Sequence, residues 1–340
     1  MTTGVQAAQP SPLLFFDTMA AYQRTEALKA AIELDVFTAV GEGNETVAAL
    51  AERCKASARG MRILCDYLMI LGFLLKEGDR YRLTPDSAVF LDRRSPACIT
   101  SAVIFLGSPQ ITDRFKNLAE AVRKGGTIAG EGSLAPEHPM WIEFAKGMAP
   151  LTGLPAEKMA RLAGAEKGEK WKVLDIAASH GTFGITLARM NPHAEIFAVD
   201  WANVLELAKE NARKAGMEGR FHTLPGSAFE VEFGTGYDIV LLTNFLHHFD
   251  AATCEKLLRK VHAALRPGGR AVTLEFVPHA DRVSPPLAAG FSLTMLASTP
   301  SGDAYTFSEL EQMFRNAGFA ASTLHEIPPV LQQVIISTKG

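Results

Sequence analysis

The 340-residue sequence contains little cysteine and no paired cysteine motif. Its four cysteines are far apart and none forms a Cys-x-x-Cys pair; they are Cys54, Cys65, Cys98 and Cys254. Zinc knuckles, dithiol redox sites and disulfide frameworks all need cysteines at short, regular spacings. The spacing argues against these sites, so we expect a protein of the reducing cytoplasm that holds no metal.

Long hydrophobic runs are also missing. No segment approaches the roughly 18 uninterrupted apolar residues that a membrane-spanning helix requires. The first residues, MTTGVQAAQPSPLLFF, lack the basic stretch and the long apolar stretch of a secretory signal. We therefore expect no association with a membrane.

Charge of neither sign is in clear excess. The sequence has 34 Lys and Arg residues against 37 Asp and Glu residues, which gives a formal net charge of -3. Such a chain exerts no global attraction on nucleic acid or on anionic membranes, so a small, neutral or modestly charged substrate is favoured. Apolar side chains are plentiful: 47% of the 340 residues are hydrophobic, and this length predicts two globular units.

Residues 1–105 are predicted to form a winged-helix-like unit. Apolar residues recur at helical spacing in the first 40 positions, as a helix pair or one broken helix, and Thr46 and Ser57 are typical caps of two further helices. Residues 73–84 then predict a hairpin that turns at Gly78. Helices followed by a hairpin are the layout of a winged helix.

A winged helix can read DNA or can serve as a packing module. The helix after Ser57, which would enter the major groove, offers only Arg59 and Arg62 for phosphate contacts. DNA-reading helices cluster basic residues, because phosphate contacts dominate such binding. We therefore expect no nucleic-acid partner, and a DNA-binding regulator is the least favoured alternative. The apolar N-terminal helices exceed what one small core can bury, which predicts a homodimer.

Residues 106–165 are expected to link the two units and to line the substrate pocket. Trp141, Phe144 and Met148 fall on one face of a predicted helix. Such a stripe is most often part of a core, and the alternative is a wall of the pocket. Prolines are expected to break the helices between residues 86 and 165; they are Pro96, Pro109, Pro136, Pro139, Pro150 and Pro155.

From residue 166 the pattern changes to strands that alternate with helices. This alternation predicts an α/β, Rossmann-like domain over residues 166–340, with a parallel sheet and helices on both of its faces. Two final strands are joined around Pro328 and Pro329. The expected strands are 171–177, 194–200, 220–225, 237–244, 270–276, 321–327 and 330–338.

The first of these strands runs into a tight turn of small residues that could bind a cofactor. Asp175 lies near the end of the strand, and Gly181 is where a ligand can best approach the backbone. Asp200 ends the second strand, where a carboxylate accepts two hydrogen bonds from a ribose diol; a helix cap is its alternative role. Trp201 could then stack on an adenine ring.

The turn favours S-adenosylmethionine over a dinucleotide. A dinucleotide holds its pyrophosphate on a Gly-x-Gly-x-x-Gly turn, and two of these glycines are Ala or Ser here. S-adenosylmethionine has no phosphate. Its cationic amino group and sulfonium can face an acid such as Asp175.

These motifs resemble those of class I O-methyltransferases of the caffeate and hydroxyneurosporene type, from about Phe16 to the C-terminus. The resemblance implies S-adenosylmethionine as cofactor and a winged-helix-like N-terminal region that dimerises. The family's loop motif is D-x-G-x-G-x-G, and this sequence has Asp175, Ala177, Ser179 and Gly181 at those positions.

A second family motif, G-D-x-F, contacts the adenine. Gly226, Ser227, Ala228 and Phe229 match it, with Ser227 in place of the acid. A serine can still hydrogen-bond an adenine edge. We also expect Asn244, at the end of the fourth strand, to lie at the cofactor.

The resemblance also implies a general base. A neutral imidazole, with a pKa near 6.5, suits the deprotonation of a phenol whose pKa is near 10. The family carries L-H-D-W with a cysteine further on, and Leu246, His247, His248, Phe249 and Cys254 match without a gap. His247 therefore takes the position of the base, and His248 replaces the family's acid.

The family orients its histidine with two acids, and the sequence retains one of them. Glu275 matches the first, whereas Ala304 stands where the second is expected. One alternative is a His247 that caps the strand and touches no substrate. A metal site made by His247 and His248 is a weaker alternative, because adjacent residues rarely converge on one ion.

Together these features predict transfer of a methyl group from S-adenosylmethionine to a hydroxyl of a small, apolar, aromatic molecule. A carbon methyltransferase and a relative that keeps the fold for a non-methylating conversion are the alternatives. The expected substrate-pocket residues are Trp141, Phe144, Met148, His248, Phe291 and Met295.

Overall fold

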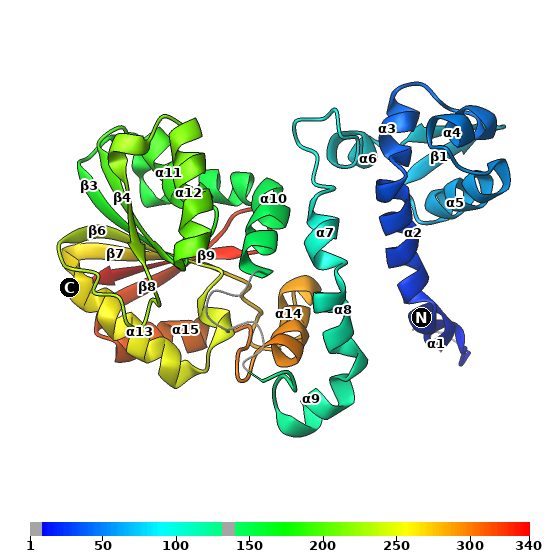
Figure 1. Cartoon of the computed structure of the whole chain (residues 1–340). Coiled ribbons are helices and arrows are strands. Elements are labelled where there is room, and N and C mark those ends of the chain that lie inside the picture. The colour runs from blue at the N-terminus through cyan, green and yellow to red at the C-terminus, as the bar shows by residue number, and fades with distance from the viewer. Residues whose placement is uncertain (1–8, 131–139) are drawn as a thin grey trace, which may run out of the picture. The chain divides into compact units, whose positions relative to one another are not determined.

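The computed structural model describes residues 9–130 and 140–340. The chain divides into two compact units, Met1–Val103 and Ile104–Gly340 (Figure 1). Residues 106–165, the predicted linker, lie in the second of these units. None of the helices that the structure describes combines the length and the hydropathy needed to cross a bilayer.

The first unit is helical apart from one hairpin. Its elements are α1 (Leu13–Met19), α2 (Ala21–Glu33), α3 (Val36–Gly41), α4 (Val47–Arg53), α5 (Ala58–Ile70), β1 (Leu74–Glu77), β2 (Arg80–Leu83) and α6 (Pro85–Phe90). The hydroxyls of Thr46 and Ser57 cap α4 and α5 by accepting backbone N–H groups at 3.3 and 3.1 Å. β1 and β2 pair antiparallel across Gly78, as predicted. The helical N-terminal segment is divided into three helices rather than two.

Apolar side chains of α2 to β2 meet in one core. Phe37, Leu50 and Tyr81 are almost completely buried there. α1 is different, because it buries no residue: Leu14 is 77% exposed and Phe16 is 60% exposed. Exposed apolar side chains on neighbouring helical turns are typical of an interaction surface.

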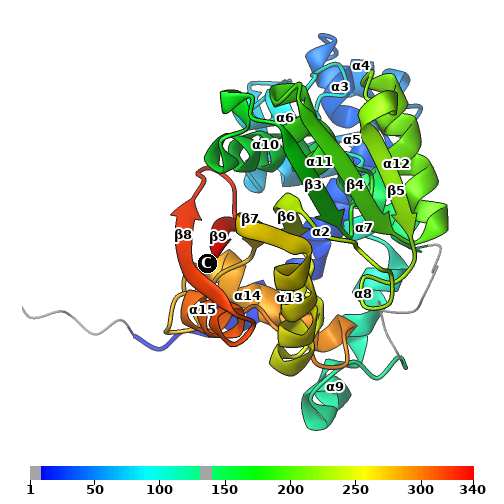
Figure 2. The ribbon, with the colours of Figure 1, turned by 90° about the vertical axis from the view of Figure 1, so that its left-hand side faces the viewer.

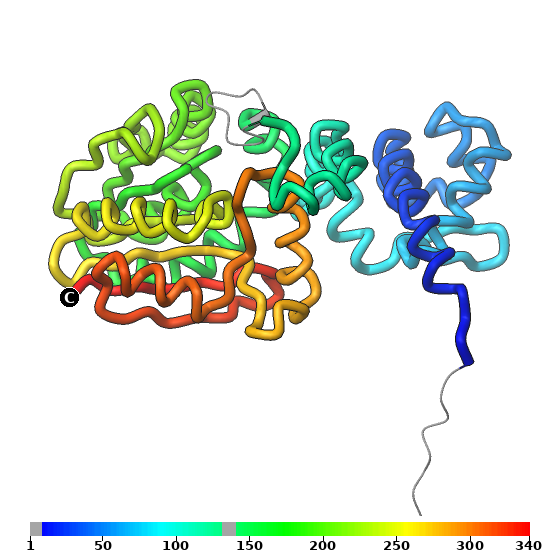
Figure 3. Tube along the Cα trace, turned by 90° about the horizontal axis from the view of Figure 1, so that it is seen from below, coloured from blue at the N-terminus to red at the C-terminus, as the bar shows by residue number. Residues whose placement is uncertain are grey.

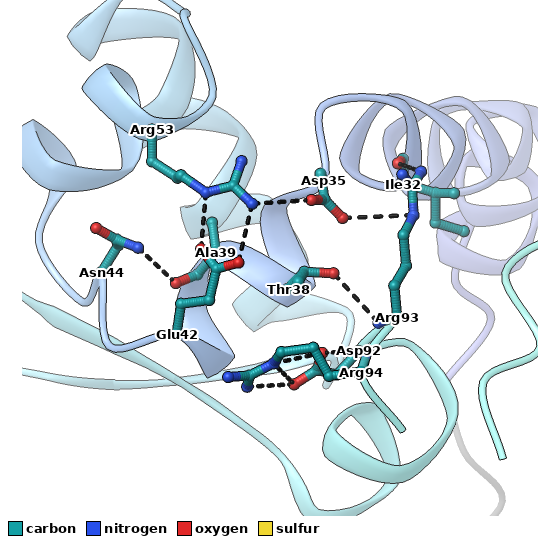
Figure 4. Close-up of polar contacts among 10 residues, drawn as sticks. All are labelled: Ile32, Asp35, Thr38, Ala39, Glu42, Asn44, Arg53, Asp92, Arg93 and Arg94. Atoms are coloured by element: carbon teal, nitrogen blue, oxygen red, sulfur yellow. Dashed lines mark hydrogen bonds and ion pairs between the residues drawn. The ribbon is translucent and has the colours of Figure 1, made fainter. Parts of the chain in front are cut away.

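Two arginines, Arg53 at the end of α4 and Arg93 after α6, make polar contacts with α2, α3 and the residues beside them (Figure 4). Arg53 donates to Glu42 at 2.7 Å and to Asp35 at 3.1 Å. Arg93 donates through its guanidinium to the Ile32 carbonyl at 2.8 Å. This carbonyl, in the last turn of α2, also accepts the Asp35 N–H at 3.2 Å, so Arg93 adds a side-chain donor at the end of the helix.

Along the chain, the elements between α6 and the first strand of the sheet are α7 (Ala102–Leu106), α8 (Pro109–Lys116), α9 (Leu118–Lys124), α10 (Met140–Ala163) and η2 (Ala165–Lys167). The expectation that Pro150 and Pro155 break a helix is wrong, because both lie inside α10. A proline in a helix interior costs about 3 kcal/mol. Burial of Ala156, Met159 and Ala160 along the same helix offsets this cost. Two other predicted breaks, at Pro136 and Pro139, lie outside the described residues.

The second unit is built on a seven-stranded sheet in the order β5-β4-β3-β6-β7-β9-β8. Its strands are β3 (Trp171–Ile176), β4 (Ala194–Asp200), β5 (Phe221–Pro225), β6 (Tyr237–Thr243), β7 (Leu265–Glu275), β8 (Phe319–Glu326) and β9 (Gln333–Lys339). β3 to β7 pair in parallel, as predicted, and β9 is antiparallel to both β7 and β8. β7 starts five residues before the expected strand at 270.

Helices cover both faces of this sheet (Figure 2). They are α11 (Thr182–Met190), α12 (Ala202–Lys214), α13 (Ala251–Ala264) and α15 (Phe307–Asn316). Val173 and Leu174 follow one another on β3 and point to opposite faces. Val173 packs with α10, α11 and α12, and Leu174 packs with α13 and α15, which run side by side beneath the sheet (Figure 3).

The order of the strands fixes where a ligand can bind. β3 lies beside β6, although β4 and β5 come between them in the chain. In an open α/β sheet, ligands bind beyond the carboxyl ends of the strands at such a switch point. The loops that follow β3, β4, β5 and β6 leave the same edge, because these strands are parallel.

One helix of this region was not predicted. α14 (Pro286–Ser298) packs against α8 and α9 and brings Phe291 and Met295 to the second unit's interior. Gly126, which follows α9, lies against the loop after α14: a Cβ at this position would lie 2.1 Å from the Pro300 carbonyl oxygen. Thr127 donates to the Thr299 carbonyl at 2.8 Å beside this contact.

We expect Gly126→Ala to lower the free energy of unfolding by about 1–3 kcal/mol, because the rigid Pro300 backbone would have to move. Gly153→Ala is the matched control. Gly153 lies on α10 with open space around its Cα, so alanine there should raise stability by about 0.5–1 kcal/mol. Urea unfolding followed by circular dichroism measures both, and equal effects of the two variants would contradict this prediction.

Candidate active site

Three residues of the loop between β3 and α11 have a left-handed backbone conformation. The φ angles of Ala177, Ser179 and Gly181 are 54°, 54° and 79°. These are the three positions at which the sequence motif D-x-G-x-G-x-G has glycine. The loop therefore keeps the glycine conformation at two positions that carry side chains, where it costs roughly 1–2 kcal/mol per residue.

Asp175 supports this loop from beneath. Its carboxylate is fully buried, and Oδ2 accepts a hydrogen bond from the Gly184 backbone N–H at 3.0 Å. Oδ1 has no hydrogen-bond partner among the described residues. Burial raises the pKa of Asp175 to about 7; the bond from Gly184 opposes this shift, and the charge of Asp200 adds to it.

Asp200, at the end of β4, fastens the loop from the side. Its two oxygens accept the backbone N–H groups of Ser179 at 2.8 Å and Trp201 at 2.7 Å. Burial raises the pKa of Asp200 to about 6, although both bonds lower it. The N-cap of α12 is Trp201, and Asp200 makes no bond to an N–H inside that helix. Half-buried Trp201 lies directly beside this carboxylate.

The loops after β5 and β6 complete the same edge. The Gly226 N–H donates to the Asp200 carbonyl at 2.9 Å, and Ser227 Oγ accepts the Phe229 N–H at 3.2 Å. Ala228 is buried between them. Asn244 has a left-handed φ of 51, and its N–H donates to the Leu274 carbonyl at 2.8 Å.

These loops fit S-adenosylmethionine. The unpartnered Asp175 Oδ1 is an acceptor that a cationic amino group would satisfy. Gly181 lets the loop pack closely on the protein core, because a Cβ there would already meet the side chains of Ile185, Ala208 and Phe221 at 3.1–3.3 Å. Asp200 keeps acceptor capacity for a diol, because each carboxylate oxygen has two lone pairs.

His247 lies at the start of the neighbouring loop and is held by Glu275. His247 Nδ1 lies 2.6 Å from Glu275 Oε2, and both side chains are buried. Glu275 Oε1 accepts the backbone N–H groups of Phe245 at 3.0 Å and Leu246 at 2.9 Å. The carboxylate therefore fixes both the imidazole ring and the backbone that carries it. Nδ1 faces Glu275, and Nε2 is the nitrogen left to meet a substrate.

Two further contacts position this histidine. Cys254 Sγ donates to the Leu246 carbonyl at 3.2 Å. Gly302 lies so close to the His247 backbone that a Cβ would be 2.2 Å from its carbonyl oxygen. Ala304, two residues on, is fully buried where the family's second acid is expected. The described residues hold no cluster of three His, Cys, Asp or Glu side chains that could bind a metal.

Aromatic rings lie against the imidazole ring of His247. Phe291 meets the His247 ring edge-on, with centroids 4.9 Å apart, and the His248 ring lies 4.4 Å away. Trp141 contacts both His248 and Phe144. The structure thus brings these predicted pocket residues together. Met295 is buried on α14, and Met148 is half-buried on α10.

The sequence analysis missed His180, which lies inside the cofactor loop. The ring is buried, and its Nδ1 accepts the Thr182 N–H at 3.1 Å. Its Nε2 lies 3.4 Å from Thr152 Oγ1 on α10. Burial lowers the pKa of His180 to about 4, so the ring is neutral at physiological pH. A large ring in a turn of small residues was the signal in the sequence.

A family model described as an O-methyltransferase domain matches residues 115–320. The chain belongs to this O-methyltransferase family. A second model, an O-methyltransferase dimerisation domain, matches residues 16–93. The predictions of the family, of the Rossmann-like fold and of S-adenosylmethionine as cofactor are thereby confirmed, and the chain is an S-adenosylmethionine-dependent O-methyltransferase.

Individual proteins resemble the enzyme over nearly its whole length. The 3-hydroxy-5-methyl-1-naphthoate 3-O-methyltransferase of Streptomyces sahachiroi is 29% identical over 327 residues, which cover 93% of this chain and 92% of the relative. The crystal structure of a Nostoc punctiforme PCC 73102 protein, proposed to be an O-methyltransferase, is 57% identical with a TM-score of 0.93, covering 98% of this chain and 100% of that one.

Human N-acetylserotonin methyltransferase in complex with S-adenosylmethionine shares the fold. Its TM-score is 0.82 at 24% identity, with 99% of this chain and 100% of that one covered. None of these similarities supports a non-methylating relative.

We expect Ala177→Gly and Ser179→Gly each to raise the free energy of unfolding by about 1 kcal/mol, because glycine adopts a positive φ without strain. Ala178→Gly is the control. Ala178 does not have a positive φ, so glycine there should lower stability. Urea denaturation measures the free energy of unfolding of the three variants. A loss of stability in all of them would contradict the interpretation that the loop is strained.

We also expect the affinity for S-adenosylhomocysteine to rise with pH. The pKa of Asp175 is about 7 in the ligand-free enzyme, so ionisation of this acid, which the ligand's ammonium group favours, is incomplete at pH 6 and largely complete at pH 8. Binding should strengthen roughly tenfold over that range and release a proton.

Calorimetry in buffers of different ionisation enthalpy measures both the affinity and the released proton. In Asp175→Asn the affinity should be lower and less dependent on pH. A wild-type affinity that does not change between pH 6 and pH 8, with no proton release, would show that Asp175 does not face the cation.

Proposed function

We propose that this enzyme methylates a hydroxyl of a small aromatic molecule, with His247 as the general base. The observation that carries the proposal is the 2.6 Å contact between Glu275 and His247 Nδ1, which leaves Nε2 for the substrate on a ring that also contacts Phe291. The Streptomyces sahachiroi relative is named for a hydroxylated naphthoate, an aromatic acid. This name and the aromatic lining support an aromatic acceptor.

In this proposal the loops at the sheet edge hold the cofactor. When bound, S-adenosylmethionine supplies an electrophilic methyl carbon on a cationic sulfur. Asp175 would face the positive charge of the cofactor, Asp200 would accept hydrogen bonds from its ribose hydroxyls, and Trp201 would stack on its adenine ring. The backbone at Ala177 and Gly181 lies along it; the remaining contacts are assigned to Ser227, Ala228, Phe229 and Asn244.

His247 supplies the proton transfer. The proton of the substrate hydroxyl moves to Nε2, and the resulting imidazolium is stabilised by Glu275 at Nδ1. Only one acid orients the ring, since Ala304 replaces the second. Glu275 can act alone because three backbone N–H groups, from Phe245 to His247, already fix its position.

The pocket residues complete the proposal. Phe291 and Met295 on α14, and Phe144 and Met148 on α10, bind the apolar ring of the substrate. Trp141 and His248 lie next to the base. We further propose that the enzyme acts in the cytoplasm on a free small molecule, and not on nucleic acid or at a membrane, as its near-neutral charge favours.

We expect His247→Gln to lower kcat about 10²–10⁴-fold, because glutamine cannot take the proton. Glu275→Gln should lower kcat and also destabilise the protein, since the buried N–H groups lose a charged acceptor. S-adenosylhomocysteine affinity in His247→Gln should stay within about threefold of wild type, corresponding to less than about 0.7 kcal/mol.

His193→Gln is the control, because His193 is exposed at the start of β4 and lies outside the site. Its turnover should equal that of wild type. A His247→Gln enzyme that turns over its substrate at the wild-type rate would remove the base from this proposal.

We also propose that the first unit forms a homodimer through α1 and the neighbouring helices. The dimerisation-domain match over residues 16–93 and the exposed side chains of α1 support this. Leu14→Glu with Phe16→Glu should convert the dimer to a monomer in sedimentation experiments. Leu287→Glu, at a 66% exposed position of α14, should leave the dimer intact. A wild-type monomer at micromolar concentration would contradict the proposal.

A further inference from the structure

Three rings form a row beside the base. The ring of His248 lies 4.4 Å from that of His247 and 5.9 Å from that of Trp141, which it meets at 90°. Trp141 comes from the first turn of α10, and His248 comes from η4 (Leu246–His248) after β6. Two segments distant in sequence thus place an indole and a second imidazole next to the reacting group.

Both of these rings carry a buried nitrogen that is not used. Trp141 Nε1 and His248 Nδ1 are buried, and neither has a hydrogen-bond partner in the described part of the chain. Leaving a buried polar atom unpaired costs about 1–3 kcal/mol, so such atoms are rare and call for a partner. Two of them on rings in contact indicate a partner that comes from outside the chain.

The chemistry of the two nitrogens limits what this partner is. An indole N–H can only donate a hydrogen bond, so Trp141 requires an acceptor. Burial, with the neighbouring His247, holds the pKa of His248 well below its usual value, so its ring is neutral and carries one N–H. With that proton on Nδ1, the two neighbouring rings offer two hydrogen-bond donors to a ligand.

The charges around the two rings are compatible with such an oxygen. The acid that the family motif has at position 248 is a histidine here, and Ala304 replaces the second acid. Glu275 is occupied by His247 and by three backbone N–H groups. The other rings that face His248 are those of Phe245 and Phe249, which are apolar. No carboxylate described at this position is free to repel an electron-rich oxygen.

We propose that Trp141 and His248 form a subsite for a carbonyl or carboxylate oxygen of the substrate, close to the hydroxyl that is methylated. The inference rests on the proposed function. It narrows the substrate to a hydroxyaromatic molecule that bears such an oxygen beside the reacting group. Where this oxygen belongs to a neutral conjugated carbonyl, it also makes the phenol more acidic, which fits a base that is oriented by one acid rather than two.

The test compares two ligands that differ only in a carboxylate group beside the hydroxyl. The dissociation constants of 3-hydroxy-2-naphthoate and 2-naphthol are measured by titration in the presence of S-adenosylhomocysteine. We expect wild type to bind the naphthoate at least tenfold more tightly. Trp141→Phe keeps a ring and removes the donor, so it should reduce this ratio to below about threefold while 2-naphthol binding stays the same.

Substitutions of His248 provide a second, independent series. His248→Phe should reduce the ratio as Trp141→Phe does, whereas His248→Asn retains a donor and should keep most of it. His248→Asp, which restores the acid of the family motif, should bind the naphthoate more weakly than 2-naphthol. S-adenosylhomocysteine affinity and the melting temperature confirm that each variant is folded.

The proposal is overturned if wild type binds the two ligands equally, if it binds neither, or if Trp141→Phe and His248→Phe keep the tenfold preference. The titration involves no turnover. A failure here is therefore distinct from a failure of His247 as base, which would appear as unchanged turnover in His247→Gln with the ligand preference intact.

Discussion

The site depends on one buried carboxylate. Glu275 enters the interior at the end of β7, where an ionised acid without partners would be strongly unfavourable. It is tolerated because Oε1 collects the N–H groups of the turn after β6, and Oε2 meets His247 Nδ1 at 2.6 Å. The contacts of Glu275 therefore offset the cost of burying its charge and hold the backbone of η4. They also determine which nitrogen of His247 can take the proton of the substrate. The rings of His248 and Phe291 then pack against the imidazole.

The cofactor loop is held by a comparable arrangement. Asp200 accepts the N–H of Ser179 in the middle of the loop, and Asp175 accepts the N–H of Gly184 in the first turn of α11; these bonds keep Ala177 and Ser179 in a conformation that glycine adopts more readily. His180 connects the loop to α10 through Thr152. The cofactor edge and the helix that carries Trp141 are thereby coupled through described contacts, so the two halves of the site are positioned together.

Much of this could be predicted from the sequence, because the signals are local. Thr46 and Ser57 are typical N-cap residues and indicate where two helices begin. The alternation of strands and helices predicts that Asp175 and Asp200 lie at strand ends. The predictions that were wrong or missing concern segments whose structure is determined by tertiary packing. Pro150 and Pro155 lie inside α10 because its buried face outweighs their cost, and the uniformly apolar α14 has no periodic pattern to reveal it. The conformation of Ala177 and the contacts of His180 depend on segments that are remote in sequence.

The central claim concerns the proton on His247, and nitrogen-15 NMR of the histidine side chains tests it most directly. With His247→Gln used to assign the signal, the account predicts that Nδ1 carries the proton, hydrogen-bonded to Glu275, and that Nε2 carries none. A proton on Nε2 in the ligand-free enzyme, or a resonance unchanged in Glu275→Gln, would contradict it.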